Sequence, residues 1–128
     1  MKISIDDSKK IFQIQEEFNK LFPYLKIEFF SKPHDPGCPS AKKFIKHCNK
    51  TLAECRSIHK RGKINISPKT TVNELEQDFG KNYGLGVQVF RKSGKVWLET
   101  TVTDSWTLEE QNKQGEELST SPQNGNAA

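Results

Sequence analysis

The 128-residue sequence lacks any apolar run that approaches the about 18 residues of a membrane-spanning helix. Its N-terminus, MKISIDDSKK, lacks the hydrophobic stretch of a secretory signal. Only three cysteines are present, an odd number in a chain large enough to form a core without disulfides. These absences predict a soluble, cytoplasmic protein with free thiols and no membrane association.

Catalytic motifs are also missing, because the sequence has no GxSxG, P-loop, HExxH or DxDxDG pattern and no GxGxxG after a strand. The glycine-bearing segment GKNYGLG falls at the end of a predicted helix, where it cannot cradle a phosphate as a helix start does. We therefore expect neither an enzyme nor a bound cofactor.

Apolar residues are scarce after Trp106, where only Leu108, Leu118 and two terminal alanines occur. A segment with so little to bury cannot offset its ordering entropy. Residues 107–128 are therefore predicted to form a disordered acidic tail, and residues 1–106 a single domain.

Within that domain, residues 2–32 and 63–92 follow one pattern, with KISI in the first matching KINI in the second. Alternating apolar residues predict a strand, apolar spacings of three and four predict a helix, and a second strand follows. Thr71 and Glu74 form a predicted capping box, and Gly84 and Pro23 are expected to end the two helices. The pattern indicates an internal repeat of strand–helix–strand units.

The turn signal Lys92-Ser-Gly-Lys95 predicts a hairpin that adds a further strand after the second repeat. The predicted fold class is α+β, with at least five strands in a mixed sheet and the helices packed on one face. A right-handed crossover would make the two strands of each repeat parallel, and a ferredoxin-like strand order is one possibility. The predicted boundaries are 1–32 for the first repeat, 33–61 for a basic linker with a short helix, and 62–106 for the second repeat with its hairpin.

The linker holds all the histidines and cysteines of the chain, which raises the hypothesis of a metal site. On a helix that starts at Leu52, Cys55 and His59 would share one face, and the remaining candidates are His34, Cys38, His47 and Cys48. The sequence has no CxxC or HxxxH pair, and alignment with the second repeat places Cys55 and His59 at core positions. We therefore expect no metal.

A catalytic cysteine is a further hypothesis, with neighbouring basic residues lowering the pKa of the Cys48 or Cys55 thiol. His47 or His59 would then serve as base, but no pattern in the sequence orders these groups. A thiol or metal-dependent enzyme is therefore the third choice.

Charge is distributed unevenly behind the net charge of +4. Residues 32–63 carry nine basic and two acidic side chains, whereas residues 96–128 carry one basic and six acidic. A basic stretch of this kind can follow a phosphate backbone, with hairpin aromatics stacking on bases. The candidate binding residues are Lys42, Lys43, Lys46, Lys50, Arg56, Lys60, Arg61 and Lys63 in the basic segment, and Phe90, Arg91, Lys92, Lys95 and Trp97 on the hairpin.

The segment FRKSGKVWLETTVTDSWTLEEQNKQG, with its VWLETT and WTLEEQN motifs, resembles the C-terminal half of a small family of bacterial single-domain proteins. The resemblance implies a bacterial, cytoplasmic protein and no particular activity. Trp97 alternates with Val96 and Leu98, so it is either exposed as a partner anchor or packed under the C-terminal tail. The leading hypothesis is a non-enzymatic module that binds a protein partner or a second copy of itself through the hairpin around Phe90 to Leu98. Nucleic-acid binding is the alternative.

Overall fold

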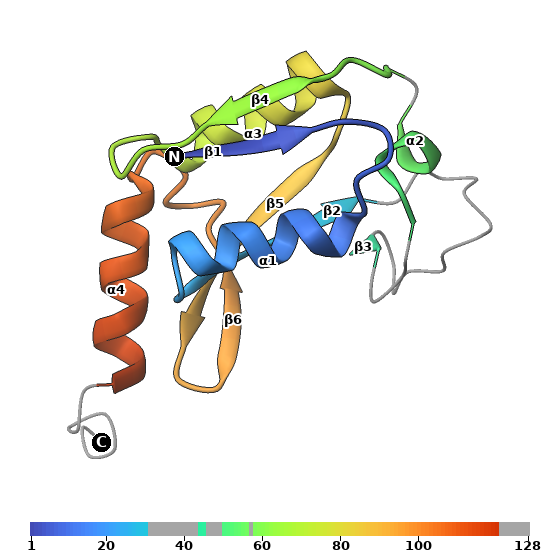
Figure 1. The fold of residues 1–128 in the computed structure, drawn as a ribbon. Coiled ribbons are helices and arrows are strands. Elements are labelled where there is room, and N and C mark those ends of the chain that lie inside the picture. Colours follow the sequence, from blue (N-terminus) through green and yellow to red (C-terminus); the bar gives the residue numbers. More distant parts are fainter. Residues whose placement is uncertain (31–43, 46–49, 57, 121–128) are drawn as a thin grey trace.

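The computed structural model describes residues 1–30, 44–45, 50–56 and 58–120. The elements in chain order are β1 (Lys2–Ile5), α1 (Ile11–Leu21), β2 (Leu25–Phe30), β3 (Phe44–Ile45), α2 (Leu52–Cys55), β4 (Gly62–Asn65), α3 (Val72–Tyr83), β5 (Val87–Ser93), β6 (Val96–Glu99) and α4 (Leu108–Thr120) (Figure 1). The α+β fold class is confirmed. No helix in the described ranges has the length and apolar character needed to cross a bilayer.

The ends of α3 follow from local chemistry, as the sequence predicts. The Glu74 N–H donates to Thr71 Oγ1 (3.1 Å), and the Thr71 N–H donates to Glu74 Oε1 (2.9 Å), so the first turn is capped from both sides. Gly84 ends the helix with φ of 66°, a left-handed conformation that favours glycine.

Strand pairing differs from the single mixed sheet that the sequence predicts. β1 pairs with β4 in a two-stranded sheet, and a second sheet has the order β3-β2-β5-β6. Every pairing among the described strands is antiparallel. The two strands of each predicted repeat therefore belong to different sheets, because the intervening helix carries the chain across the core rather than over one sheet.

The predicted repeats meet at matching positions in both sheets. Ile3 lies opposite Ile64 in the β1–β4 register, and Glu28 lies opposite Gln88 in the β2–β5 register. Each residue is opposite the one that the repeat alignment assigns to it. Two strand–helix–strand units related by an approximate twofold axis would pair in this register. The common origin of the two units stays a prediction.

One hydrophobic core joins the two sheets and the helices. In Figure 1, β1 and β4 lie above the core and β2 and β5 below it, with α1 in front and α3 behind. The helices thus flank the core, and the buried side chains of β2 and β5 all lie on the one face of the four-stranded sheet that is turned toward it. The largest side chains are fully buried, and Phe29 meets Phe79 edge to face with centroids 6.0 Å apart.

The predicted disordered tail is wrong over residues 108–120, which form α4. The Glu110 N–H donates to Thr107 Oγ1 (3.1 Å) and the Thr107 N–H to Glu110 Oε1 (2.8 Å), so a capping box also starts this helix. Leu108 and Gln111 are fully buried, and α4 packs on β5. A few well-placed contacts thus order a segment with little apolar surface. Residues 121–128 of the predicted tail lie outside the described residues, as does most of the predicted linker.

Candidate interaction surface

The β5–β6 hairpin ends the four-stranded sheet on one side and extends beyond the core (Figure 1). Ser93 pairs with Val96, so the connecting turn has two residues, and Gly94 takes φ of 64° in it. A two-residue turn with positive φ matches the twist of antiparallel strands. The hairpin that the sequence predicts at Lys92–Lys95 is therefore confirmed, and it makes β6 the edge strand.

Helix α4 holds the hairpin in place from one face. The Gly94 N–H donates to Ser119 Oγ (3.1 Å) at the tip of the hairpin. Arg91 donates through Nη1 to Gln111 Oε1 (2.9 Å), and its guanidinium lies over the Trp106 ring at 5.7 Å. Arg91, a predicted binding residue, therefore has its charge engaged within the molecule, because strand alternation turns it toward α4.

The opposite face of the hairpin gathers basic and aromatic side chains. The Lys26 Nζ lies 5.4 Å from the Phe90 ring centroid and 5.0 Å from that of Trp97, and the Lys92 Nζ lies 5.9 Å from Trp97. Lys26 also pairs with Glu28 at 3.0 Å. These contacts bring together three of the predicted hairpin residues, Phe90, Lys92 and Trp97, with Lys26, which the sequence analysis did not single out.

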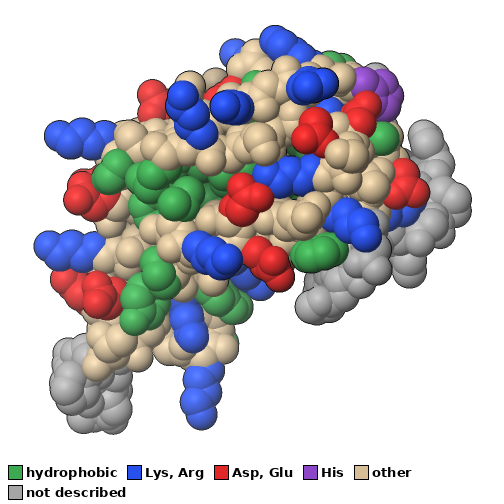
Figure 2. Space-filling model, viewed as in Figure 1, with side chains coloured by type: hydrophobic (Ala, Val, Ile, Leu, Met, Phe, Trp, Pro, Cys, Tyr) green, Lys and Arg blue, Asp and Glu red, His purple; other side chains and the backbone are tan. Residues whose placement is uncertain are grey.

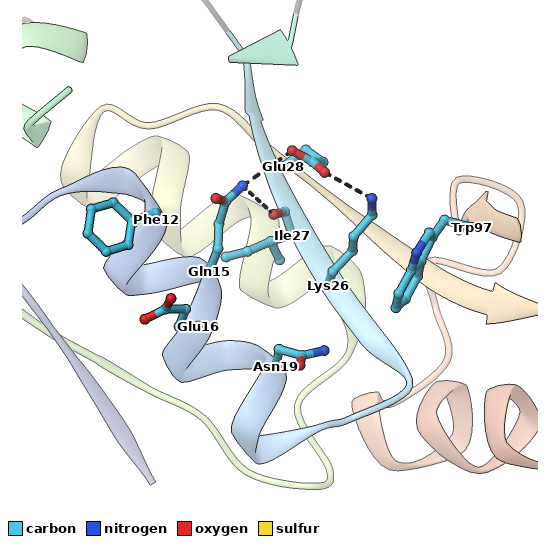
Figure 3. Close-up of a pocket in the computed structure, with 8 residues that line it drawn as sticks. All are labelled: Phe12, Gln15, Glu16, Asn19, Lys26, Ile27, Glu28 and Trp97. Atoms are coloured by element: carbon cyan, nitrogen blue, oxygen red, sulfur yellow. Dashed lines mark hydrogen bonds and ion pairs between the residues drawn. The ribbon is translucent and has the colours of Figure 1, made fainter. Parts of the chain in front are cut away.

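A shallow groove of about 480 Å³ lies beside this face, between α1 and β6 (Figure 3). Its lining comes from one face of α1, the middle of β2 and the indole on β6, and consists of Phe12, Gln15, Glu16, Asn19, Lys26, Ile27, Glu28 and Trp97. The groove is mostly polar in residue type, and it adjoins the face on which Lys26 and Trp97 meet.

Exposure along β6 differs from the prediction for Trp97. Trp97 is only half-buried against Lys26 and Lys92, whereas Val96 and Leu98 are 55% and 41% exposed. Since α4 packs on β5, the apolar side chains of β6 on that face are left open to solvent. The exposed apolar residues of the hairpin are therefore Val96 and Leu98, while Lys95 is exposed in the turn.

Backbone hydrogen bonds show which residues of β6 face the free edge. The Thr100 N–H donates to Val89 O (3.3 Å), and the turn closes at the pair of Ser93 and Val96. Hydrogen-bonded and non-hydrogen-bonded pairs alternate along an antiparallel ladder. Val96, Leu98 and Thr100 consequently turn their backbone groups toward β5. Trp97 and Glu99 turn theirs toward the free edge, where no strand of the described residues pairs with them.

Other edges of the same sheet are capped by helix side chains. Asn19 Nδ2 donates to Leu25 O (2.8 Å) and Gln15 Nε2 donates to Ile27 O (3.0 Å), so α1 covers the β2 edge that β3 leaves open. These amides satisfy backbone acceptors that another strand would otherwise use.

On β5, beyond the end of β6, the Val89 N–H donates to Glu76 Oε2 (3.0 Å). Burial raises the pKa of the Glu76 carboxyl, and the bond from Val89 opposes part of that shift. An acidic side chain is thus held in a partly buried position to cap one N–H. β6 differs from β2 and β5 because no such cap is present on it within the described part of the chain.

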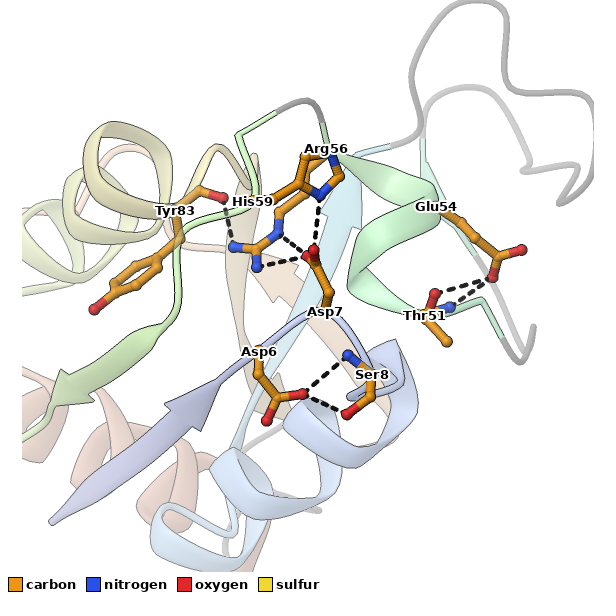
Figure 4. A network of polar contacts seen from close by, with 8 residues as sticks. All are labelled: Asp6, Asp7, Ser8, Thr51, Glu54, Arg56, His59 and Tyr83. Carbon is orange, nitrogen blue, oxygen red and sulfur yellow. Dashed lines mark hydrogen bonds and ion pairs between the residues drawn. The ribbon is translucent and has the colours of Figure 1, made fainter.

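Arg56, a predicted binding residue of the basic segment, is buried with only 2% of its surface exposed. Its Nη2 donates to Asp7 Oδ1 (2.8 Å) and its Nη1 to Tyr83 O (3.0 Å) (Figure 4). The bond from Arg56 lowers the pKa of the Asp7 carboxyl, and His59 contributes in the same direction. Arg56 therefore joins the loop after β1 to the end of α3 and is not available to phosphate.

The remaining basic candidates do not join the hairpin. Lys60, Arg61 and Lys63 are exposed around β4, which belongs to the other sheet and lies away from the hairpin (Figure 1). Lys50 is half-buried. Lys42, Lys43 and Lys46 lie outside the described residues. On the face shown in Figure 2, basic and acidic side chains are interspersed rather than gathered by sign.

The two metal candidates point to different surroundings. Helix α2 ends at Cys55, and Arg56 already has extended backbone (φ −143°), so the predicted helical spacing of Cys55 and His59 is wrong. Cys55 belongs to the core, while His59 is exposed with Nδ1 2.9 Å from Asp7 Oδ2. The described residues contain no group of three potential metal ligands. His34, Cys38, His47 and Cys48 lie outside them.

The sequence predicts the hairpin but not the side chains that cap β2 and β5 and so distinguish their edges from the edge of β6. The signal for Gln15 and Asn19 was their spacing of four on the helix, which places both on one face. No family model, curated protein or solved structure matches the chain, so its resemblance to a bacterial family stays a prediction.

Proposed function

We propose that the chain is a non-enzymatic interaction module that binds an extended segment of a protein along the free edge of β6. The observation that carries the proposal is the contrast between edges. Side chains of α1 and α3 cap backbone groups of β2 and β5, whereas no strand or side chain of the described residues pairs with the outward backbone groups of Trp97 and Glu99. Natural sheets protect edges that have no partner to bind.

The side chains of β6 suit strand addition. Val96 and Leu98 offer exposed apolar surface on one face of the strand, and the Trp97 indole lies on the other. In strand addition, main-chain hydrogen bonds supply affinity and alternate side chains supply specificity. Because α4 and β5 fix the hairpin, little ordering of the binding edge accompanies binding, which favours affinity.

A panel of displayed random peptides tests the proposal. We expect selected linear peptides to slow hydrogen exchange at the Trp97 and Glu99 amides and to lose affinity for Glu99→Pro, since proline removes an outward N–H without removing a bond to β5. Gln88→Ala, a change on β5 away from the free edge, serves as the control. Peptides that bind Glu99→Pro as tightly as the unmodified chain would contradict strand addition.

Single-stranded nucleic acid is the second candidate ligand, favoured by the grouping of Phe90, Trp97, Lys26 and Lys92 on one face. Retention on single-stranded RNA or DNA at low salt, lost as salt is raised and weakened by Trp97→Ala, would support it. Absence of retention at low salt would remove it.

A further inference from the structure

We infer that the occupant of the β6 edge is the same edge of a second copy of this chain, paired antiparallel about a twofold axis at Leu98. This inference rests on the proposed function, since it names the partner of the same edge. It depends on the spacing of the outward residues, on the side chains that this register brings together and on their charges.

The outward backbone groups of β6 are self-complementary in one register. A twofold axis at Leu98 places Trp97 opposite Glu99 of the second copy, and Glu99 opposite Trp97 of the second copy. Both residues are the ones that turn their N–H and C=O groups outward. Each of the two pairs can therefore exchange both of its hydrogen bonds, and no outward group of β6 is left over.

The two neighbouring registers that also pair outward residues are less favourable. Centring the axis on Glu99 would place two carboxylates directly opposite each other, which is destabilising. Centring it on Trp97 would place Glu99 opposite Lys95, which lies in the turn rather than in the strand. Only the axis at Leu98 keeps both outward pairs within β6.

The side chains that this register brings together are complementary. The two Leu98 residues would form a non-hydrogen-bonded pair, in which side chains approach most closely, and each is now 41% exposed. Glu99 would lie beside Trp97 of the second copy, a ring that already has the ammonium groups of Lys26 and Lys92 at 5.0 and 5.9 Å. Apolar surface thus meets apolar surface, and a carboxylate approaches a basic cluster. The result is one sheet that continues from β3 through β6 into the second copy.

Sedimentation equilibrium of the full chain measures the association. We expect a reversible dimer that Leu98→Lys and Glu99→Pro each weaken about tenfold or more, because the first adds facing like charges and the second removes a donor from each chain. Val102→Lys is the matched control. Val102 is 96% exposed just after β6, and its substitution adds the same charge without touching the edge. Circular dichroism confirms that each variant is folded.

Cross-linking tests the register. With Cys38 and Cys48 replaced by serine, Leu98→Cys is expected to form an intermolecular disulfide, since Cα atoms of such a pair lie about 4.5 Å apart. Val96→Cys, which would face Thr100 of the second copy, is expected to form no intermolecular disulfide under the same oxidation. Cross-linking of Val96→Cys but not Leu98→Cys would overturn the Leu98-centred register.

A chain that stays monomeric at about 0.5 mM, or a dimer that neither Leu98→Lys nor Glu99→Pro weakens, would overturn self-association through β6. The peptide panel separates this failure from that of the proposed function. A monomer whose edge still binds peptides, sensitive to Glu99→Pro, retains strand addition with another partner. A monomer whose edge binds no peptide fails both tests.

Discussion

Replacement of Gly115 by alanine tests the docking of α4, the helix formed by residues 108–120 of the predicted disordered tail. Gly115 is buried in the middle of α4, where it faces β5 and the loop before β2. A Cβ built there would lie 2.9 Å from Tyr24 Cβ, 3.2 Å from Arg91 Cγ and 3.2 Å from Lys92 O. Two of these atoms belong to the backbone or lie next to it, so neither can move aside cheaply.

Two effects of opposite sign compete in Gly115→Ala. Alanine is favoured over glycine within a helix by about 1 kcal/mol. Overpacking a tight contact costs about 1 to 3 kcal/mol. Because a contact below 3.0 Å requires α4 to shift, we expect the upper part of that range, and a net loss of about 1 to 2 kcal/mol in the free energy of unfolding. For a chain of this size the loss lowers Tm by about 3 to 7 °C.

Gly80→Ala provides the matched control in α3. A Cβ at Gly80 would meet only Leu85 O, at 4.0 Å, so the helix preference acts alone and the variant should gain about 0.5 to 1 kcal/mol. Urea unfolding followed by circular dichroism measures both variants against the unmodified chain. A Gly115→Ala variant as stable as the unmodified chain, or more so, would refute close packing of α4 on β5.

Three further predictions concern stability. Asp7→Asn should destabilise the fold at neutral pH, because it replaces the carboxylate that pairs with buried Arg56. Since the pKa of Asp7 is lowered in the folded state, the stability that this carboxylate contributes is present above its ordinary pKa of 3.8 and is lost as pH falls through the folded pKa. A stability difference between the variant and the unmodified chain that persists unchanged into strong acid would contradict this prediction. Glu76→Gln should stabilise the fold at pH 7, because burial raises the pKa of the Glu76 carboxyl and penalises its ionised form; the gain in Tm should shrink in acid as that carboxyl takes up its proton. Phe79→Ala should cost about 3 to 5 kcal/mol in urea unfolding by opening a cavity against Phe29, and Phe79→Leu should cost clearly less; equal losses would argue against tight packing there.

Local elements were predictable where the sequence alone satisfies the backbone. Thr71, Glu74 and Gly84 bound α3 through contacts within a few residues of each other, so their spacing sufficed. The same signal, Thr107 followed by Glu110, opens α4, although the low apolar content of the segment predicts disorder. Apolar composition does not predict this helix, because its stability depends on the packing of Leu108, Gln111 and Gly115 against residues elsewhere in the chain.

The candidate site was predictable in place but not in detail. Alternation along β5 and β6 indicated the hairpin and grouped Lys92 with Trp97. Alternation could not show that α4 packs on β5 while Val96 and Leu98 stay exposed, nor that Arg56 pairs with Asp7, 49 residues away in the chain. These outcomes depend on contacts between segments distant in sequence.

Periodicity and caps within a few residues are enough to predict the α+β class, the strand–helix–strand order of both units and the hairpin, because none of these features needs a contact between distant segments. Which strands pair, whether α4 is ordered and which sheet edges are capped by helix side chains depend on the folded arrangement as a whole. Those choices arise when distant segments compete to satisfy the same backbone groups and bury the same surface. The free edge of β6 is the result of that competition.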